Sequence, residues 1–68
     1  MFKFRIWNNE GEYVCDAGTA ADAKRLVACG FEGAALVRKV KFDERGYLID
    51  AENNLINMDG TIAKKMEV

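Results

Sequence analysis

The chain repeats one seven-residue pattern three times in succession, as DERGYLI (residues 43–49), DAENNLI (50–56) and NMDGTIA (57–63). Each unit has Asp or Asn at its first position, Gly or Asn at its fourth, and two apolar residues at its end. A further copy, NNEGEYV, occupies residues 8–14. This repeat decides the fold of the second half of the chain.

The repeat has the residue types of a tight turn followed by a short strand. Asp or Asn at the start of a turn accepts hydrogen bonds from the backbone that follows, and Gly or Asn tolerates the positive φ that closes it. Such a turn joins antiparallel strands and leaves a bulge beside it. The apolar pair supplies a strand only about 10–13 Å long. We therefore expect a turn-rich β-meander over residues 43–66.

The third repeat also resembles the second half of a calcium-binding EF-hand loop. That loop needs an oxygen ligand at its first position and an acidic ligand at its twelfth. When the loop is aligned on Gly60, these positions are Leu55 and Met66, and neither side chain supplies an oxygen. The repeat is therefore interpreted as turn chemistry, and no metal site is expected.

Residues 1–17 are expected to form a β-hairpin, because residues 2–7 alternate between apolar and basic or aromatic side chains. Phe2, Phe4 and Ile6 share one face, and Lys3, Arg5 and Trp7 share the other. With a four-residue loop, the second strand adds Tyr13, Cys15 and Ala17 to the apolar face. A bulge in that strand would reverse its faces.

Residues 19–30 have the pattern of a helix. Thr19 is a suitable N-cap, Asp22 lies where the helix dipole favours a carboxylate, and Gly30 ends the helix as a left-handed residue. Residues 34–42 follow as a third strand, with a change of pattern at Arg38 and Lys39 that indicates a bulge or a twist.

These elements predict an α+β fold in which a single helix packs on an antiparallel sheet. The order is β-β-α-β followed by the short-stranded meander, and residues 1–68 are expected to form one small domain. No family motif covers enough of the chain to name a family.

Composition argues against an enzyme. The 68 residues carry a net charge of −1, and they include no His, which removes the usual general base and the commonest metal ligand. There is also no Ser, and the acidic residues Asp43, Glu44, Asp50, Glu52 and Asp59 lie at turn positions, where solvated carboxylates are ordinary. We expect neither catalysis nor a cofactor.

The two cysteines, Cys15 and Cys29, match no zinc or redox motif. We expect reduced, largely buried thiols, with a disulfide between them as the alternative. The chain has no secretory signal pattern and no apolar run long enough to span a membrane. It begins at Met1 directly before a strand, so we expect a complete cytoplasmic protein without membrane contact.

The candidate functional surface is the outward face of the sheet, where Trp7 is expected to lie exposed among cations. Trp and Arg are favoured in protein interfaces, and the same residue types stack bases and neutralise phosphates. The candidate residues are Lys3, Arg5, Trp7, Arg38, Lys39 and Lys41. The competing interpretation is an ordinary surface, with Lys3 and Arg5 paired to Asp16 and Trp7 covering the edge of the core.

From this face we expect a small binding module that acts on a protein partner. An accessory or inhibitor protein of a phage or mobile element is the kind of binding module that we expect. Nucleic-acid binding through the same face is one alternative. A homo-oligomer assembled through the short edge strands of the meander is another.

Overall fold

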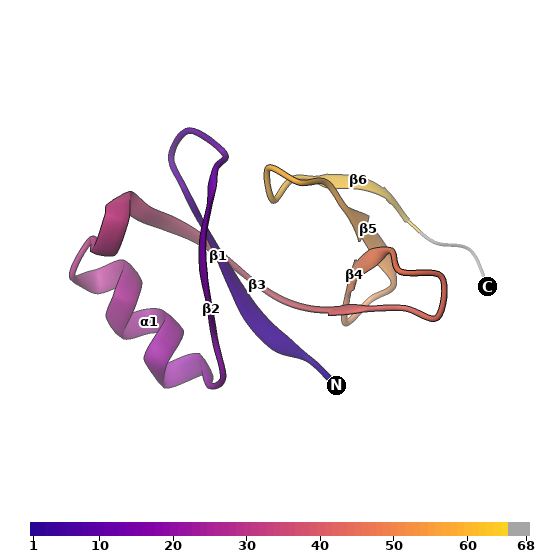
Figure 1. Ribbon diagram of the computed structural model, residues 1–68, viewed down its shortest axis with the longest axis horizontal. Helices are drawn as coiled ribbons and strands as arrows, with labels where there is room; N and C mark the ends of the chain where they lie inside the picture. The colour runs from indigo at the N-terminus through magenta and orange to yellow at the C-terminus, as the bar shows by residue number, and fades with distance from the viewer. Residues whose placement is uncertain (66–68) are drawn as a thin grey trace.

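The computed structural model describes residues 1–65, and their strands form one antiparallel sheet in the order β2-β1-β3-β4-β5-β6 (Figure 1). Its strands are β1 (Lys3–Asn8), β2 (Tyr13–Ala17), β3 (Ala34–Phe42), β4 (Leu48–Asp50), β5 (Asn54–Ile56) and β6 (Ile62–Lys65). Helix α1 (Ala20–Ala28) and a short 3-10 helix, η1 (Phe31–Gly33), join β2 to β3. The expected α+β order is confirmed. Residue 66, the expected end of the meander, lies outside the described residues.

Three of the four turns have the side-chain hydrogen bonds that the repeat predicts. In the turns that begin at Asn8, Asp43 and Asp50, the side-chain Oδ1 accepts the backbone N–H groups two and four residues later, each at 2.9 Å. The fourth residue of every turn has a φ between 64° and 88°. Asn53 fills this position in one turn, where the others have Gly.

In the turn from residue 57 to residue 61, the side chain that accepts the backbone hydrogen bond belongs to the third residue instead of the first. The Oδ1 of Asp59 accepts the N–H of Thr61 at 3.0 Å and its hydroxyl at 2.6 Å. Asn57 donates through its side-chain amide to the Thr61 hydroxyl at 2.9 Å. The backbone still closes as in the other turns, because Gly60 donates to the Asn57 carbonyl at 3.0 Å.

The sheet has an apolar cluster on each side. Figure 1 shows α1 towards one end of the molecule and β4–β6 at the other, with β1 and β3 between them. On the face of β1 that points to α1, Ile6 packs with Ala17, Ala23 and Ala34. The small Ala side chains let the helix approach the sheet closely. We call this side the α1 face.

On the opposite side, the meander folds back over β1 and β3. Trp7, Val40 and Ile56 are buried there, with Leu36 and Leu48 packed against them. We call this side the meander face. Most of its cluster comes from residues far apart in the sequence, so its formation ties the meander to the first half of the chain.

Gly60 is the point of closest approach between the two halves. A Cβ built on Gly60 would lie 2.6 Å from Cδ2 of Trp7 and 2.9 Å from Cδ2 of Leu36. Two hydrogen bonds fix the same turn: the Trp7 indole N–H donates to the Met58 carbonyl at 2.8 Å, and the Arg38 Nε–H donates to the Gly60 carbonyl. The turn therefore covers Trp7 and is hydrogen-bonded to it.

The hairpin differs from expectation at Tyr13. The turn spans five residues, as in the meander, so Asn8 pairs with Glu12 and Trp7 pairs with Tyr13. Val14 then forms a bulge, and beyond it Cys15 pairs with Ile6. The expected core position of Tyr13 is therefore wrong, and the residue lies on the meander face. Cys15 and Ala17 lie on the α1 face, as expected.

In β3 the bulge lies away from the expected position. Residues 36–40 pair regularly with β1, and the register shifts at Ala35 instead of at Arg38 and Lys39. Arg38 and Lys39 are neighbours in a regular strand, so Arg38 lies on the meander face and Lys39 lies on the α1 face.

The ends of α1 are as the sequence predicts. The Thr19 hydroxyl accepts the Asp22 N–H at 3.1 Å, and Gly30 has a φ of 68°. Both cysteines are free thiols. Cys15 is half-buried, but the expected burial of Cys29 is wrong, because it caps the helix in solvent.

Replacing Gly60 with Ala should destabilise the protein more than replacing Gly46 with Ala. Both residues have a strongly positive φ, but a Cβ at Gly46 has nothing within 4 Å. We expect G46A to lower the free energy of unfolding by about 1–2 kcal/mol through backbone strain. The collision with Trp7 should add about 1–3 kcal/mol in G60A. Urea unfolding measures both, and equal losses would contradict the contact.

The stability should fall in acid, partly through Asp50. Slight burial raises the pKa of this carboxyl. Hydrogen bonds from the Asn54 side chain and from the N–H groups of Asn54 and Glu52 lower the pKa, and so does the charge of Arg38. The net effect is a pKa below the ordinary value of an Asp side chain. Because the folded pKa is the lower one, the stabilisation is present above the unfolded pKa and is lost as the pH falls through the folded value.

Asp50→Asn is the variant that tests this. Asn keeps the Oδ1 acceptor, as Asn8 does in its own turn, but does not titrate. We expect the loss of unfolding free energy between about pH 5 and pH 2 to be smaller in D50N than in the unmodified protein. Parallel pH profiles for the two proteins would show that Asp50 has no part in the loss.

Candidate functional site

Two of the six candidate residues belong to the interior. Trp7 is 1% exposed in the cluster on the meander face, so the expected exposed Trp is wrong. Arg38 is half-buried and donates to the carbonyl of Gly60. The alternation placed both side chains on the correct side of β1 and β3, but the meander covers that part of the face.

Two further candidates lie on the other side of the sheet. Lys39 is paired with Phe4 of the α1 face, and Lys41 lies two residues further along β3 on the same side. Their ammonium groups lie 5.6 Å and 5.0 Å from the centre of the Phe2 ring. The expectation of a single basic face is therefore wrong, because the sheet separates these lysines from Lys3 and Arg5.

Lys3 and Arg5 remain at the surface of the meander face, and both bind Asp16. The Lys3 ammonium lies 2.9 Å from one carboxylate oxygen, and the Arg5 Nε donates to the other at 3.1 Å. Partial burial raises the pKa of the Asp16 carboxyl, but the two cations outweigh it and lower the pKa below 3.8. The ion pairs expected across the hairpin are confirmed.

Arg5 borders an apolar groove of about 440 Å³. Buried Trp7, half-buried Leu48 and buried Ile56 form its floor, and its rim consists of exposed large side chains. The rim residues are Tyr13, Phe42, Tyr47 and Met58. We call this site the Arg5 groove. Three segments of the chain converge on it: the first hairpin, the turn after β3, and the turn that covers Trp7.

The Arg5 guanidinium lies between two rings of this rim. Its central carbon is 4.7 Å from the centre of the Tyr13 ring and 5.5 Å from that of Phe42. These distances are within the range of cation–π attraction, which strengthens when the groups are shielded from water. Together with the Asp16 hydrogen bond, the rings hold Arg5 in one position.

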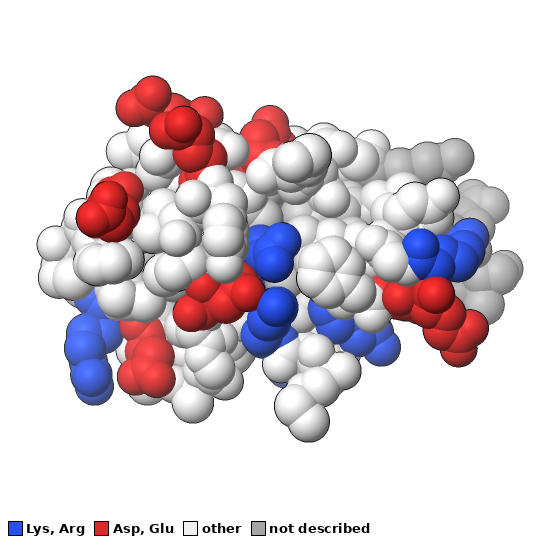
Figure 2. Space-filling model, in the orientation of Figure 1, with Lys and Arg blue, Asp and Glu red and all other residues white. Residues whose placement is uncertain are grey.

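The charge around the Arg5 groove is only weakly positive. Lys3 and Arg5 share the single carboxylate of Asp16, so this cluster has one positive charge in excess. Arg45, stacked on the Tyr47 ring, is paired with Asp43 at 3.5 Å. In the view of Figure 2, basic side chains lie beside acidic ones and form no continuous basic field.

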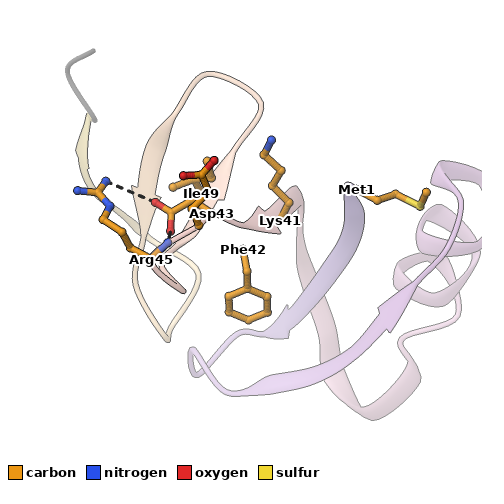
Figure 3. A pocket seen from close by; sticks show the side chains of 7 residues that line it. Met1, Lys41, Phe42, Asp43, Arg45 and Ile49 are labelled. Carbon is orange, nitrogen blue, oxygen red and sulfur yellow. Dashed lines mark hydrogen bonds and ion pairs between the residues drawn. The ribbon is translucent and has the colours of Figure 1, made fainter.

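A second hollow, of about 540 Å³, lies between Met1 and the turn after β3 (Figure 3). Lys41 and Phe42 point in opposite directions there, as neighbours on a strand do, and Asp43 and Arg45 bind one another. The Asp43 carboxylate also accepts the backbone N–H groups of its own turn. Two carboxylates line this hollow, and that of Asp43 already accepts hydrogen bonds within its own turn, whereas Glu44 is exposed.

The described residues can be compared with the patterns of metal sites and membrane-spanning helices. Within residues 1–65, no group of three or more acidic, Cys or His side chains is placed to hold a metal ion. No helix in the same range is long and apolar enough to cross a bilayer.

Comparison of the chain with protein-family models, with curated proteins and with solved structures finds no match. A cytoplasmic location and a phage or mobile-element origin stay predictions.

Sequence reasoning missed the whole rim of the groove. Phe42 could have been placed by alternation along β3, because it lies two residues after Val40 and therefore shares its face. Tyr13 could have been placed by applying the five-residue turn of the meander to residues 8–12. No sequence signal indicates that Tyr47 and Met58 come together, because they belong to different turns.

Trp fluorescence tests the burial of Trp7 directly, since the chain has a single Trp. We expect an emission maximum at shorter wavelength than that of free Trp, with weak quenching by acrylamide, because the ring is shielded by the turn at Gly60. Urea should shift the emission to longer wavelength. Quenching of the folded protein as strong as that of free Trp would contradict the position of this turn.

Proposed function

We propose that the protein is a non-enzymatic binding module and that the Arg5 groove receives a segment of a protein partner. One observation carries this proposal. Seven large apolar side chains are exposed among the described residues, and four of them, Tyr13, Phe42, Tyr47 and Met58, border the same groove. Single exposed apolar residues are ordinary, whereas a cluster around a hollow is typical of an interaction site.

The residue types suit recognition of a protein. Tyr and Arg are enriched among the residues that dominate binding energy, since each combines a large contact area with polar groups. Met58 is 94% exposed, and its unbranched side chain can adapt to the shape of a partner. Arg5 already contacts Asp16 and the two rings, which reduces the entropy that its side chain loses on binding.

Nucleic-acid binding has less support. Exposed Tyr and Phe rings could stack on bases, but phosphate binding needs several cations that are free to replace counterions. On this face Lys3, Arg5 and Arg45 each lie beside a carboxylate. Lys39 and Lys41 lie on the other side of the sheet. Self-assembly through β6, the edge strand of the meander, is a separate alternative.

Selection from a random-peptide display library, followed by fluorescence anisotropy with the selected peptides, tests the proposal. We expect F42S and Y47S to weaken peptide binding at least tenfold, because each removes a ring from the rim. The matched control is F31S, since Phe31 is 44% exposed and lies outside the groove. Circular dichroism verifies that each variant is folded.

Three results would count against the proposal. Peptide binding that survives both groove substitutions would place the site elsewhere. Tighter binding of oligo-dT than of any peptide, with a steep dependence on salt, would favour nucleic acid. A stable dimer in light scattering, lost in F42S, would show that the groove binds a second copy of the chain.

A further inference from the structure

Arg5 has hydrogen-bonding capacity that the fold leaves unused. A guanidinium carries five N–H donors, and the Nε–H of Arg5 is the one that binds Asp16. Among the described residues, the structure gives its two terminal Nη groups no hydrogen-bond partner. The side chain is only 20% exposed, and Arg5 is one of the residues that line the groove.

The contacts around Arg5 fix the position of its guanidinium, including the two terminal nitrogens. Asp16 fixes the Nε side, and the Tyr13 and Phe42 rings flank the guanidinium carbon at 4.7 Å and 5.5 Å. The terminal nitrogens of a guanidinium can bind both oxygens of one carboxylate, and a planar donor held in place binds it with geometric specificity.

We propose that the Arg5 groove recognises an acidic residue beside an apolar one in its partner. The Asp or Glu carboxylate binds the free edge of Arg5, and the apolar side chain lies between Tyr47 and Met58 over the apolar floor. This inference rests on the proposed function of the groove and specifies the chemistry of its occupant.

The charge balance favours a carboxylate over a phosphate. Lys3, Arg5 and Asp16 together leave one positive charge, which matches the single charge of a carboxylate. A phosphate monoester carries close to two negative charges at neutral pH. The next cation along the rim, Arg45, is paired with Asp43. The apolar floor also fits a side chain better than it fits a sugar-phosphate backbone.

A double-mutant cycle on a selected peptide tests the inference. The peptide is made with its Asp or Glu, with the corresponding amide, and with phosphoserine at that position. We expect the amide to bind about tenfold more weakly than the acid, and R5Q to bind the acid and the amide equally. R5K retains the charge but loses the planar edge, so it should recover only part of the affinity.

The control for charge removal is R25Q. Arg25 is 79% exposed on α1, and its only ion pair among residues 1–65, with Asp22, is long at 3.9 Å. We expect this variant to discriminate between the acid and the amide as the unmodified protein does. Circular dichroism shows whether each variant is folded. If R5Q does not fold, R5K takes its place in the comparison of the acid and the amide.

The possible outcomes distinguish a failure of the carboxylate inference from a failure of the proposed binding function of the groove. Selected peptides that need Phe42 but carry no acidic residue, or that bind R5Q as tightly as the unmodified protein, would overturn the carboxylate inference alone. Tighter binding of the phosphoserine peptide than of the acid would overturn it in favour of a phosphate. A library that yields no peptide dependent on Phe42 would overturn both.

Discussion

The contact between Trp7 and the turn at Gly60 is the constraint on which the rest of the structure depends. A strand in the first hairpin contributes the largest buried side chain, and a turn near the end of the described chain covers it. Without this contact, the first hairpin, α1 and β3 would keep one apolar cluster, but the meander would have little to pack against. An isolated group of strands as short as β4, β5 and β6 has marginal stability in water.

This contact also creates the groove. Because the turn after Asn57 bends back over Trp7, Met58 comes to lie near Tyr47, although eleven positions separate them in the sequence. The floor of the groove is the outer surface of the buried cluster. The aromatic rim is therefore supported by residues whose main role is folding, and Arg5 is held by a neighbouring ion pair with Asp16.

The sequence predicts the local structure well and the long-range structure poorly. The cap at Thr19, the left-handed Gly30 and the four turns follow from residue types at fixed spacing, and all are confirmed. The burial of Trp7 could not be predicted in this way. Alternation tells which side of a strand a residue occupies, but it does not tell which distant segment covers that side. The same reason explains why Arg38 was expected at the surface.

The turns separate the residues that determine folding from the residues proposed to bind a partner. In the first and third repeats, the constrained positions are Asp43 with Gly46 and Asn57 with Gly60, whereas Tyr47 and Met58 occupy positions that vary from copy to copy. Substitutions at Tyr47 or Met58 therefore leave the turn hydrogen bonds and the left-handed glycines intact. If the groove binds as proposed, such a scaffold can change its ligand preference during evolution without passing through unfolded intermediates.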